Sequence, residues 1–114
     1  MKKFERINKV AFADLSLQKA FLGLQEGKHE DKQLAKFLQR AIDDLKKNPF
    51  CGIRIPSKLW PKEYVMKYGI DNLRKYNLPD SWRLIYTIRG NKLEIISVLI
   101  EWFNHKNYER KFKY

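Results

Sequence analysis

Apolar residues recur at two different spacings along this chain, and each spacing predicts a different kind of element. In residues 31–47 they recur every three or four positions, which predicts a helix with one apolar face. A shorter helix is expected from 14 to about 23, with Asp14 as its N-cap. Residues 8–13 alternate weakly and predict a first strand. The face of the long helix consists of Leu34, Phe37, Leu38, Ala41, Ile42 and Leu45.

The second half of the chain predicts mostly strands. Its expected elements are an extended piece at 53–55, a helical turn at 63–68, strands at 73–78, 81–89 and 93–101, and a short helix capped by Asn104. Pro79-Asp80 and Gly90-Asn91 supply the turns between the strands. The whole order predicts one α+β domain over residues 1–114. Two N-terminal helices would pack on an antiparallel sheet of about four strands, and a short C-terminal helix would follow.

The strand at 81–89 carries an arginine among residues that are typical of a half-buried strand. Side chains alternate between the two faces of a strand, so Arg83 is expected on the same face as Ile85 and Thr87. The other face would pack on the core with Trp82, Leu84, Tyr86 and Ile88. The face of Arg83 is therefore expected to be the wetter one, and Arg83 is a candidate for binding a phosphate.

The chain is strongly basic, with 24 Lys and Arg against 13 Asp and Glu and a net charge of +11. Most of the excess lies after residue 53. This balance predicts a polyanionic partner: nucleic acid first, an acidic protein second and an anionic membrane surface third. Solubility alone is the simpler alternative.

Other chemistries find little support in the sequence. Cys51 is the single cysteine, so it has no internal disulfide partner and is compatible with a reducing compartment. One cysteine and two histidines give no metal-ligand cluster, and no glycine-rich phosphate loop is present. The basic start Met1-Lys2-Lys3 lacks a following apolar run, and the longest apolar run, at 95–100, is too short to span a bilayer. We therefore expect a cytoplasmic protein with no cofactor, metal or membrane partner.

Four short motifs occur in a fixed order along the chain. A long helix ends in Leu45-Lys46-Lys47-Asn48-Pro49, and Phe50-Cys51-Gly52 follows with Pro56 and Leu59. The third motif is Trp82-Arg83-Leu84-Ile85-Tyr86, and in the fourth an apolar strand leads to His105 and Tyr108. Together, over about residues 10–110, these motifs resemble the RelE/ParE superfamily of bacterial and archaeal type II toxins, and the second resembles YoeB-type members.

The resemblance implies a RelE-like fold and a toxin that is neutralised by a cognate antitoxin protein. Members of the RelE branch cleave messenger RNA in the ribosomal A site, whereas members of the ParE branch poison DNA gyrase and lack the nuclease residues. We expect a RelE-like endoribonuclease that acts on mRNA on the ribosome by metal-free attack of a 2'-hydroxyl. The alternatives are a ParE-like gyrase inhibitor, or a non-catalytic relative that only binds nucleic acid or its partner.

The resemblance also assigns roles to three residues, each with a structural alternative. Arg83 would grip the scissile phosphate, or it would form an ion pair with Glu94 on the next strand. His105 would supply or take a proton, or it would belong to an Asn-His helix cap. Tyr108, one turn later, would supply or take a proton in place of His105, stack on a base or support the phosphate, or it would anchor the helix in the core. We expect Arg83 and His105 to approach each other on one concave basic surface.

Further residues would hold the RNA. The preceding strand carries Arg74, Lys75 and Asn77, where Lys75 and Asn77 share one face and Arg74 takes the other. Lys75 matches a lysine of the ribosome-dependent toxins, and Asn77 replaces a second one. YoeB-like members place a glutamate base after the proline that matches Pro56, but Ser57-Lys58 stands here. Lys58 could contribute charge to RNA binding or remain a solvated lysine.

Two apolar features have alternative interpretations. Trp60-Pro61, with Tyr64 and Tyr68, could form an aromatic platform for bases or could line the edge of the core. Around Leu34, Phe37 and Leu38, the junction of the helices with the sheet is expected to leave a groove for a helix of the antitoxin.

Overall fold

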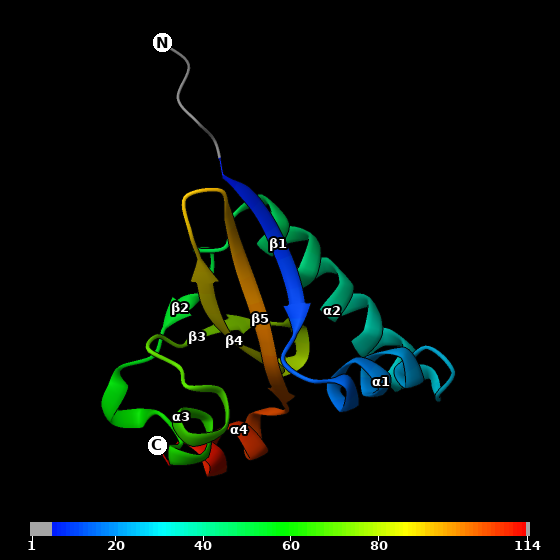
Figure 1. Cartoon of the computed structure of the whole chain (residues 1–114). Coiled ribbons are helices and arrows are strands. Elements are labelled where there is room, and N and C mark those ends of the chain that lie inside the picture. Colours follow the sequence, from blue (N-terminus) through cyan, green and yellow to red (C-terminus); the bar gives the residue numbers. More distant parts are fainter. Residues whose placement is uncertain (1–5, 114) are drawn as a thin grey trace.

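The computed structural model describes residues 6–113, so the basic Met1-Lys2-Lys3 lies outside the described residues. The chain folds as an α+β protein with helices packed on a sheet (Figure 1). The elements are β1 (Ile7–Phe12), α1 (Leu15–Leu24), α2 (His29–Lys47), β2 (Ile53–Arg54), η1 (Ser57–Leu59), α3 (Lys62–Tyr68), β3 (Arg74–Asn77), η2 (Pro79–Ser81), β4 (Arg83–Gly90), β5 (Glu94–Phe103) and α4 (His105–Phe112).

Polar side chains define where the helices begin. Asp14 caps α1 by accepting a hydrogen bond from the backbone N–H of Leu17, and Asn104 caps α4 in the same way through Asn107, which confirms both predicted caps. The start of α2 is His29, two residues before the predicted start at Asp31. Asp31 instead lies in the first turn, where its carboxylate accepts the backbone N–H of Lys28 at 3.1 Å.

The sheet has five strands in the order β1-β5-β4-β3-β2, so the prediction of about four antiparallel strands was wrong in two respects. The two residues of β2 pair with β3 as an extra edge strand, and β1 runs parallel to β5 (Figure 1). Tight connections make β3 antiparallel to β4 and β4 antiparallel to β5. The partners β1 and β5 lie far apart in the sequence, and no hairpin dictates their relative direction.

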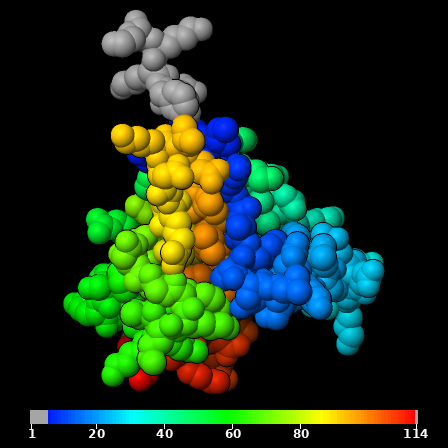
Figure 2. Space-filling model, in the orientation of Figure 1, coloured from blue at the N-terminus to red at the C-terminus, as the bar shows by residue number. Residues whose placement is uncertain are grey.

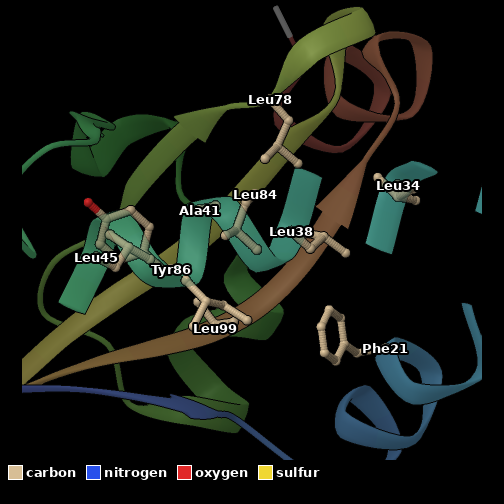
Figure 3. Packing of buried hydrophobic residues seen from close by; sticks show 10 residues of the cluster. Phe21, Leu34, Leu38, Ala41, Leu45, Leu78, Leu84, Tyr86 and Leu99 are labelled. Carbon is tan, nitrogen blue, oxygen red and sulfur yellow. The ribbon is translucent and has the colours of Figure 1, made fainter. Parts of the chain in front are cut away.

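Helices cover both faces of the central strand β4. On one face, Leu84 and Tyr86 pack with residues of α1 and α2 in a first core (Figure 3). On the other, Ile85 packs with residues of α3 and α4 in a second core. Ile85 and Thr87 are 0% and 2% exposed, so the expectation of a wetter face around Arg83 was wrong along most of β4. Arg83 remains half-buried because it lies at the end of the strand.

The first core also fills the groove that was expected around α2. Leu34 and Leu38 are 5% and 1% exposed and belong to the same buried cluster as Phe21 of α1 (Figure 3). Phe37 packs against that cluster and is only partly buried. The apolar residues of this junction are therefore used for the fold itself, and the docking site predicted for an antitoxin helix was wrong in this form.

A buried tyrosine ties the segment before β2 to the centre of the sheet. The hydroxyl of Tyr86 donates a hydrogen bond to the carbonyl of Pro49 at 2.8 Å and accepts one from the N–H of Gly52 at 3.0 Å. A Cβ atom on Gly52 would lie 2.5 Å from this hydroxyl, so only glycine allows the approach. Burial raises the pKa of Tyr86, which keeps the hydroxyl protonated and able to donate.

Asp14 joins α1 to α3 as well as capping α1. Its carboxylate accepts hydrogen bonds from the hydroxyl of Ser16 at 2.7 Å and of Tyr68 at 3.2 Å, and it lies 3.4 Å from the ammonium of Lys67. These contacts, led by those of Ser16 and the N–H of Leu17, lower the pKa of Asp14 from 3.8 to about 2. The folded protein therefore favours the ionised carboxylate.

We predict that Tyr86→Phe lowers the free energy of unfolding by about 1–3 kcal/mol, because it leaves a buried N–H and carbonyl without their partner. Urea unfolding followed by circular dichroism measures the change. The matched variant Tyr68→Phe removes a hydroxyl whose acceptor has other donors, so it should cost clearly less. Equal losses in the two variants would contradict the role given to Tyr86.

We also predict that Asp14 contributes to stability above its unfolded pKa near 3.8 and that this contribution disappears as the pH falls toward about 2. Asp14→Asn keeps an acceptor for the cap but cannot ionise. The difference in thermal midpoint between the natural protein and this variant should therefore shrink between pH 6 and pH 2. In Ser16→Ala the carboxylate loses one donor, so part of the pH dependence should remain. A constant difference across this range would rule out the linkage.

Candidate functional site

Arg83 lies at the start of β4 with much of its hydrogen-bonding capacity unused. Its guanidinium donates one hydrogen bond, to the carbonyl of Trp82 at 3.1 Å, and lies 5.8 Å from the ring centroid of Tyr108. Among residues 6–113 it has no carboxylate partner. Glu94, the alternative partner predicted for it, instead forms an ion pair with Lys9 at 2.8 Å. Since a guanidinium carries five N–H donors, most of them remain available for an anion.

Lys75 joins Arg83 from the neighbouring strand. In the register of β3 and β4, Lys75 lies opposite Ile85 and Asn77 lies opposite Arg83, so these side chains share one face as predicted. The ammonium of Lys75 is 5.2 Å from the ring centroid of Tyr108. Two cations from two strands therefore converge on one aromatic ring.

Tyr108 supports this pair from within the second core. Its side chain is 3% exposed and packs on Phe112 with the ring centroids 4.7 Å apart. The buried ring agrees with the predicted alternative in which Tyr108 anchors α4 in the core. The ring holds the cationic ends of Lys75 and Arg83 by cation–π attraction while α4 is docked on the sheet.

His105 is the first residue of α4 and lies at the surface. Its Nε2 is 2.7 Å from a carboxylate oxygen of Glu109 one turn later, and both side chains are more than half exposed. The cap of α4 is made by Asn104, so the ring of His105 takes no part in it. Arg83 reaches α4 at Tyr108, one turn after His105. The shared surface of Arg83 and His105 remains a prediction.

Arg74 points away from Lys75, Arg83 and Tyr108, and its contacts stabilise the fold. Its guanidinium donates hydrogen bonds to the carbonyls of Gly52 at 2.8 Å and Phe50 at 3.3 Å and lies over the ring of Phe50. It lies opposite Tyr86 in the sheet and therefore on the face of the first core. The structure thus separates Arg74 from Lys75 and Arg83.

Lys58 belongs to a cleft that the motifs did not reveal. This cleft of about 800 Å³ separates η1 and the start of α3 from α4. Figure 2 shows the corresponding green and red parts of the chain in contact at one end of the molecule. Trp60 and Pro61 line it as well, while Tyr64 is buried in the second core. The basic residues after Tyr108, namely Arg110, Lys111 and Lys113, were the signal in the sequence that could have identified it.

The described residues contain no group of three or more His, Cys, Asp or Glu side chains that could hold a metal ion. Within the same part of the chain, no helix combines the length and apolar character needed to cross a bilayer.

Comparison with known proteins gives one positive result. No curated protein and no solved structure matches the chain. Residues 6–101 match the family described as the ParE toxin of the type II toxin-antitoxin system parDE. The matched region contains Lys75 and Arg83 and ends before His105 and Tyr108. Because it spans most of the sequence, the chain belongs to the ParE toxin family of type II toxin–antitoxin systems.

Proposed function

We propose that this toxin is an endoribonuclease that cleaves messenger RNA, with Arg83 as the group that binds the scissile phosphate. The family implies an antitoxin protein as partner. The state of Arg83 carries the proposal for RNA. Its side chain is half-buried, donates one hydrogen bond to a backbone carbonyl, and has no carboxylate partner among the described residues. A guanidinium in this condition suits the two non-bridging oxygens of a phosphodiester.

The chemistry requires charge stabilisation more than any other contribution. Attack of a 2'-hydroxyl on the adjacent phosphorus adds negative charge to the phosphate oxygens before the 5'-oxygen leaves. Arg83 and Lys75 would stabilise that charge from two neighbouring strands. Tyr108 is assigned the role of a positioning residue, because its ring holds both cations while its own side chain is buried.

His105 supplies the candidate for proton transfer. Its imidazole is at the surface, and the carboxylate of Glu109 at 2.7 Å can orient the ring, as carboxylates orient catalytic histidines in other enzymes. The second ring nitrogen would donate a proton to the leaving 5'-oxygen. The proton of the attacking 2'-hydroxyl would pass to water, because no carboxylate follows Pro56 to accept it. Lys58 and Asn77 would contact the RNA beyond the scissile phosphate, while the contacts of Arg74 favour a structural role.

The second candidate is inhibition of DNA gyrase without RNA cleavage. Two observations favour it: the family match is to the ParE toxins, and no carboxylate follows Pro56 where YoeB-like toxins have their base. In that case the cationic pair Lys75 and Arg83 would contribute to binding a protein or a protein–DNA complex.

We predict that Arg83→Ala lowers the rate of mRNA cleavage by on the order of a hundredfold or more, because it removes charge stabilisation from the transition state. Primer extension on ribosome-bound mRNA measures cleavage, and growth after induction without antitoxin measures toxicity. Arg83→Lys keeps the charge and loses the planar fork, so it should recover only part of the rate. The control Arg40→Ala removes the same charge from the exposed side of α2 and should cut as fast as the natural protein.

A parallel supercoiling assay with purified gyrase separates the two candidates. Intact messages together with inhibited gyrase would overturn the nuclease proposal and support the second candidate. Cleaved messages with unaffected gyrase would support the first.

A further inference from the structure

We propose that the cleft between η1–α3 and α4 binds single-stranded RNA, namely the nucleotides that flank the phosphate held by Arg83. The inference rests on the proposed function for its choice of RNA. Its geometry is independent of that function, because none of Lys75, Arg83 and Tyr108 lines the cleft. The lining residues are Lys58, Leu59, Trp60, Pro61, Lys62, Glu63, Phe103, Asn107, Arg110, Lys111, Phe112 and Lys113.

The charge of the cleft is strongly one-sided. Five of its lining residues are cationic and one, Glu63, is anionic. Glu63 forms an ion pair with Lys111, whose ammonium also lies 5.3 Å from the ring centroid of Tyr64. The other four cations, Lys58, Lys62, Arg110 and Lys113, are exposed and form no ion pair within residues 6–113. Such a concentration of unpaired positive charge attracts a polyanion.

Aromatic groups line the same cleft. Trp60 is partly exposed, and its indole N–H donates to the carbonyl of Ile55 at 2.8 Å, which fixes the ring in place. Phe103 is also partly exposed and packs edge-on against Phe112, with the centroids 6.4 Å apart. Preorganised aromatic surfaces next to cations are the combination that binds single-stranded nucleic acid, because bases stack while phosphates meet the charges.

One lining residue of the cleft, Phe103, is the sheet neighbour of Arg83. Phe103 lies opposite Arg83 in the register of β4 and β5, so their side chains are neighbours on one face of the sheet. Arg83 contacts the ring of Tyr108, Tyr108 packs on Phe112, and Phe112 packs on Phe103. An RNA strand whose scissile phosphate is held by Arg83 would therefore reach the cleft by way of the partly exposed Phe103.

An acidic segment of a protein is the competing occupant. It would be attracted by the same four cations, but it would gain little from the faces of Trp60 and Phe103. A cleft of about 800 Å³ is at the upper end of the size of ligand pockets and has room for stacked bases. We therefore assign it to RNA.

The test uses the full chain and an RNA oligonucleotide of about 12 nucleotides, within the usual site size of single-strand binders. Its 2'-hydroxyls are methylated, so binding is measured without cleavage, by fluorescence anisotropy at several salt concentrations. The double variant Lys62→Glu, Arg110→Glu should weaken binding on the order of tenfold or more. The slope of the logarithm of the binding constant against the logarithm of the salt concentration should also become shallower by about 1.4. Each lost phosphate contact contributes about 0.7 for single strands, and the variant removes two.

The control Lys32→Glu, Lys36→Glu makes the same change in net charge on the exposed side of α2 and should alter affinity much less. Trp60→Phe keeps an aromatic face and should retain most of the affinity, whereas Trp60→Leu should lose about tenfold. Circular dichroism and thermal midpoints identify any variant that fails to fold, and the surface charge variants then decide the outcome.

Equal weakening by both double variants would overturn the proposal, because it would assign binding to the general positive field of the protein. An acidic peptide of similar length that binds as tightly as the RNA, with no dependence on Trp60, would overturn it in favour of a protein segment. If messages are cut normally while the cleft variants bind RNA like the natural protein, this inference fails and the nuclease proposal stands. If the RNA requires the cleft but no message is cut, the cleft stands and the nuclease proposal fails.

Discussion

Burial of β4 on both faces is the constraint on which the rest of the structure depends. Leu84, Ile85 and Tyr86 are consecutive and fully buried, so the two sides of the strand must each be covered. Helices α1 and α2 cover one side and α3 and α4 the other, and each pair supplies its own core. A strand with a wet face would have needed only one of these layers.

The same constraint determines where chemistry can occur. Along the middle of β4 there is no room for a polar side chain that lacks a partner, and Thr87 donates to the carbonyl of Asn72 at 2.7 Å. At its first residue the strand emerges from between the two helical layers. Arg83 is half-buried there, and most of its N–H donors have no partner among the described residues. The first turn of α4 meets this point, so the second core brings Tyr108 under Arg83 and Lys75.

Tertiary contacts also explain why an arginine and a lysine that are adjacent in the sequence have different roles. Arg74 and Lys75 point to opposite faces of β3. Arg74 donates hydrogen bonds to the carbonyls of Phe50 and Gly52. The hydroxyl of Tyr86 binds the same segment through the N–H of Gly52. Lys75 faces the second core and α4. One face of β3 therefore stabilises the segment before β2, and the other directs the charge of Lys75 toward Tyr108 of α4.

Local patterns in the sequence determined the elements themselves. The periodicity of 31–47, the caps Asp14 and Asn104, and the Gly90-Asn91 turn each act within a few residues, and the structure contains the helices and the hairpin that they predict. The motif around Arg83 led to the toxin superfamily, which the match to the ParE toxin family supports.

What only the tertiary structure decided depends on residues far apart in the chain. No hairpin joins β1 to β5, so their parallel pairing was not visible in local patterns. The face of Arg83 is covered by α3 and α4, which come from both sides of β4 in the sequence. The cleft of Lys58, Trp60 and Arg110 exists because α4 packs beside η1, about 50 residues away along the chain. Local periodicity specifies which side of an element is apolar, whereas packing decides what lies against it.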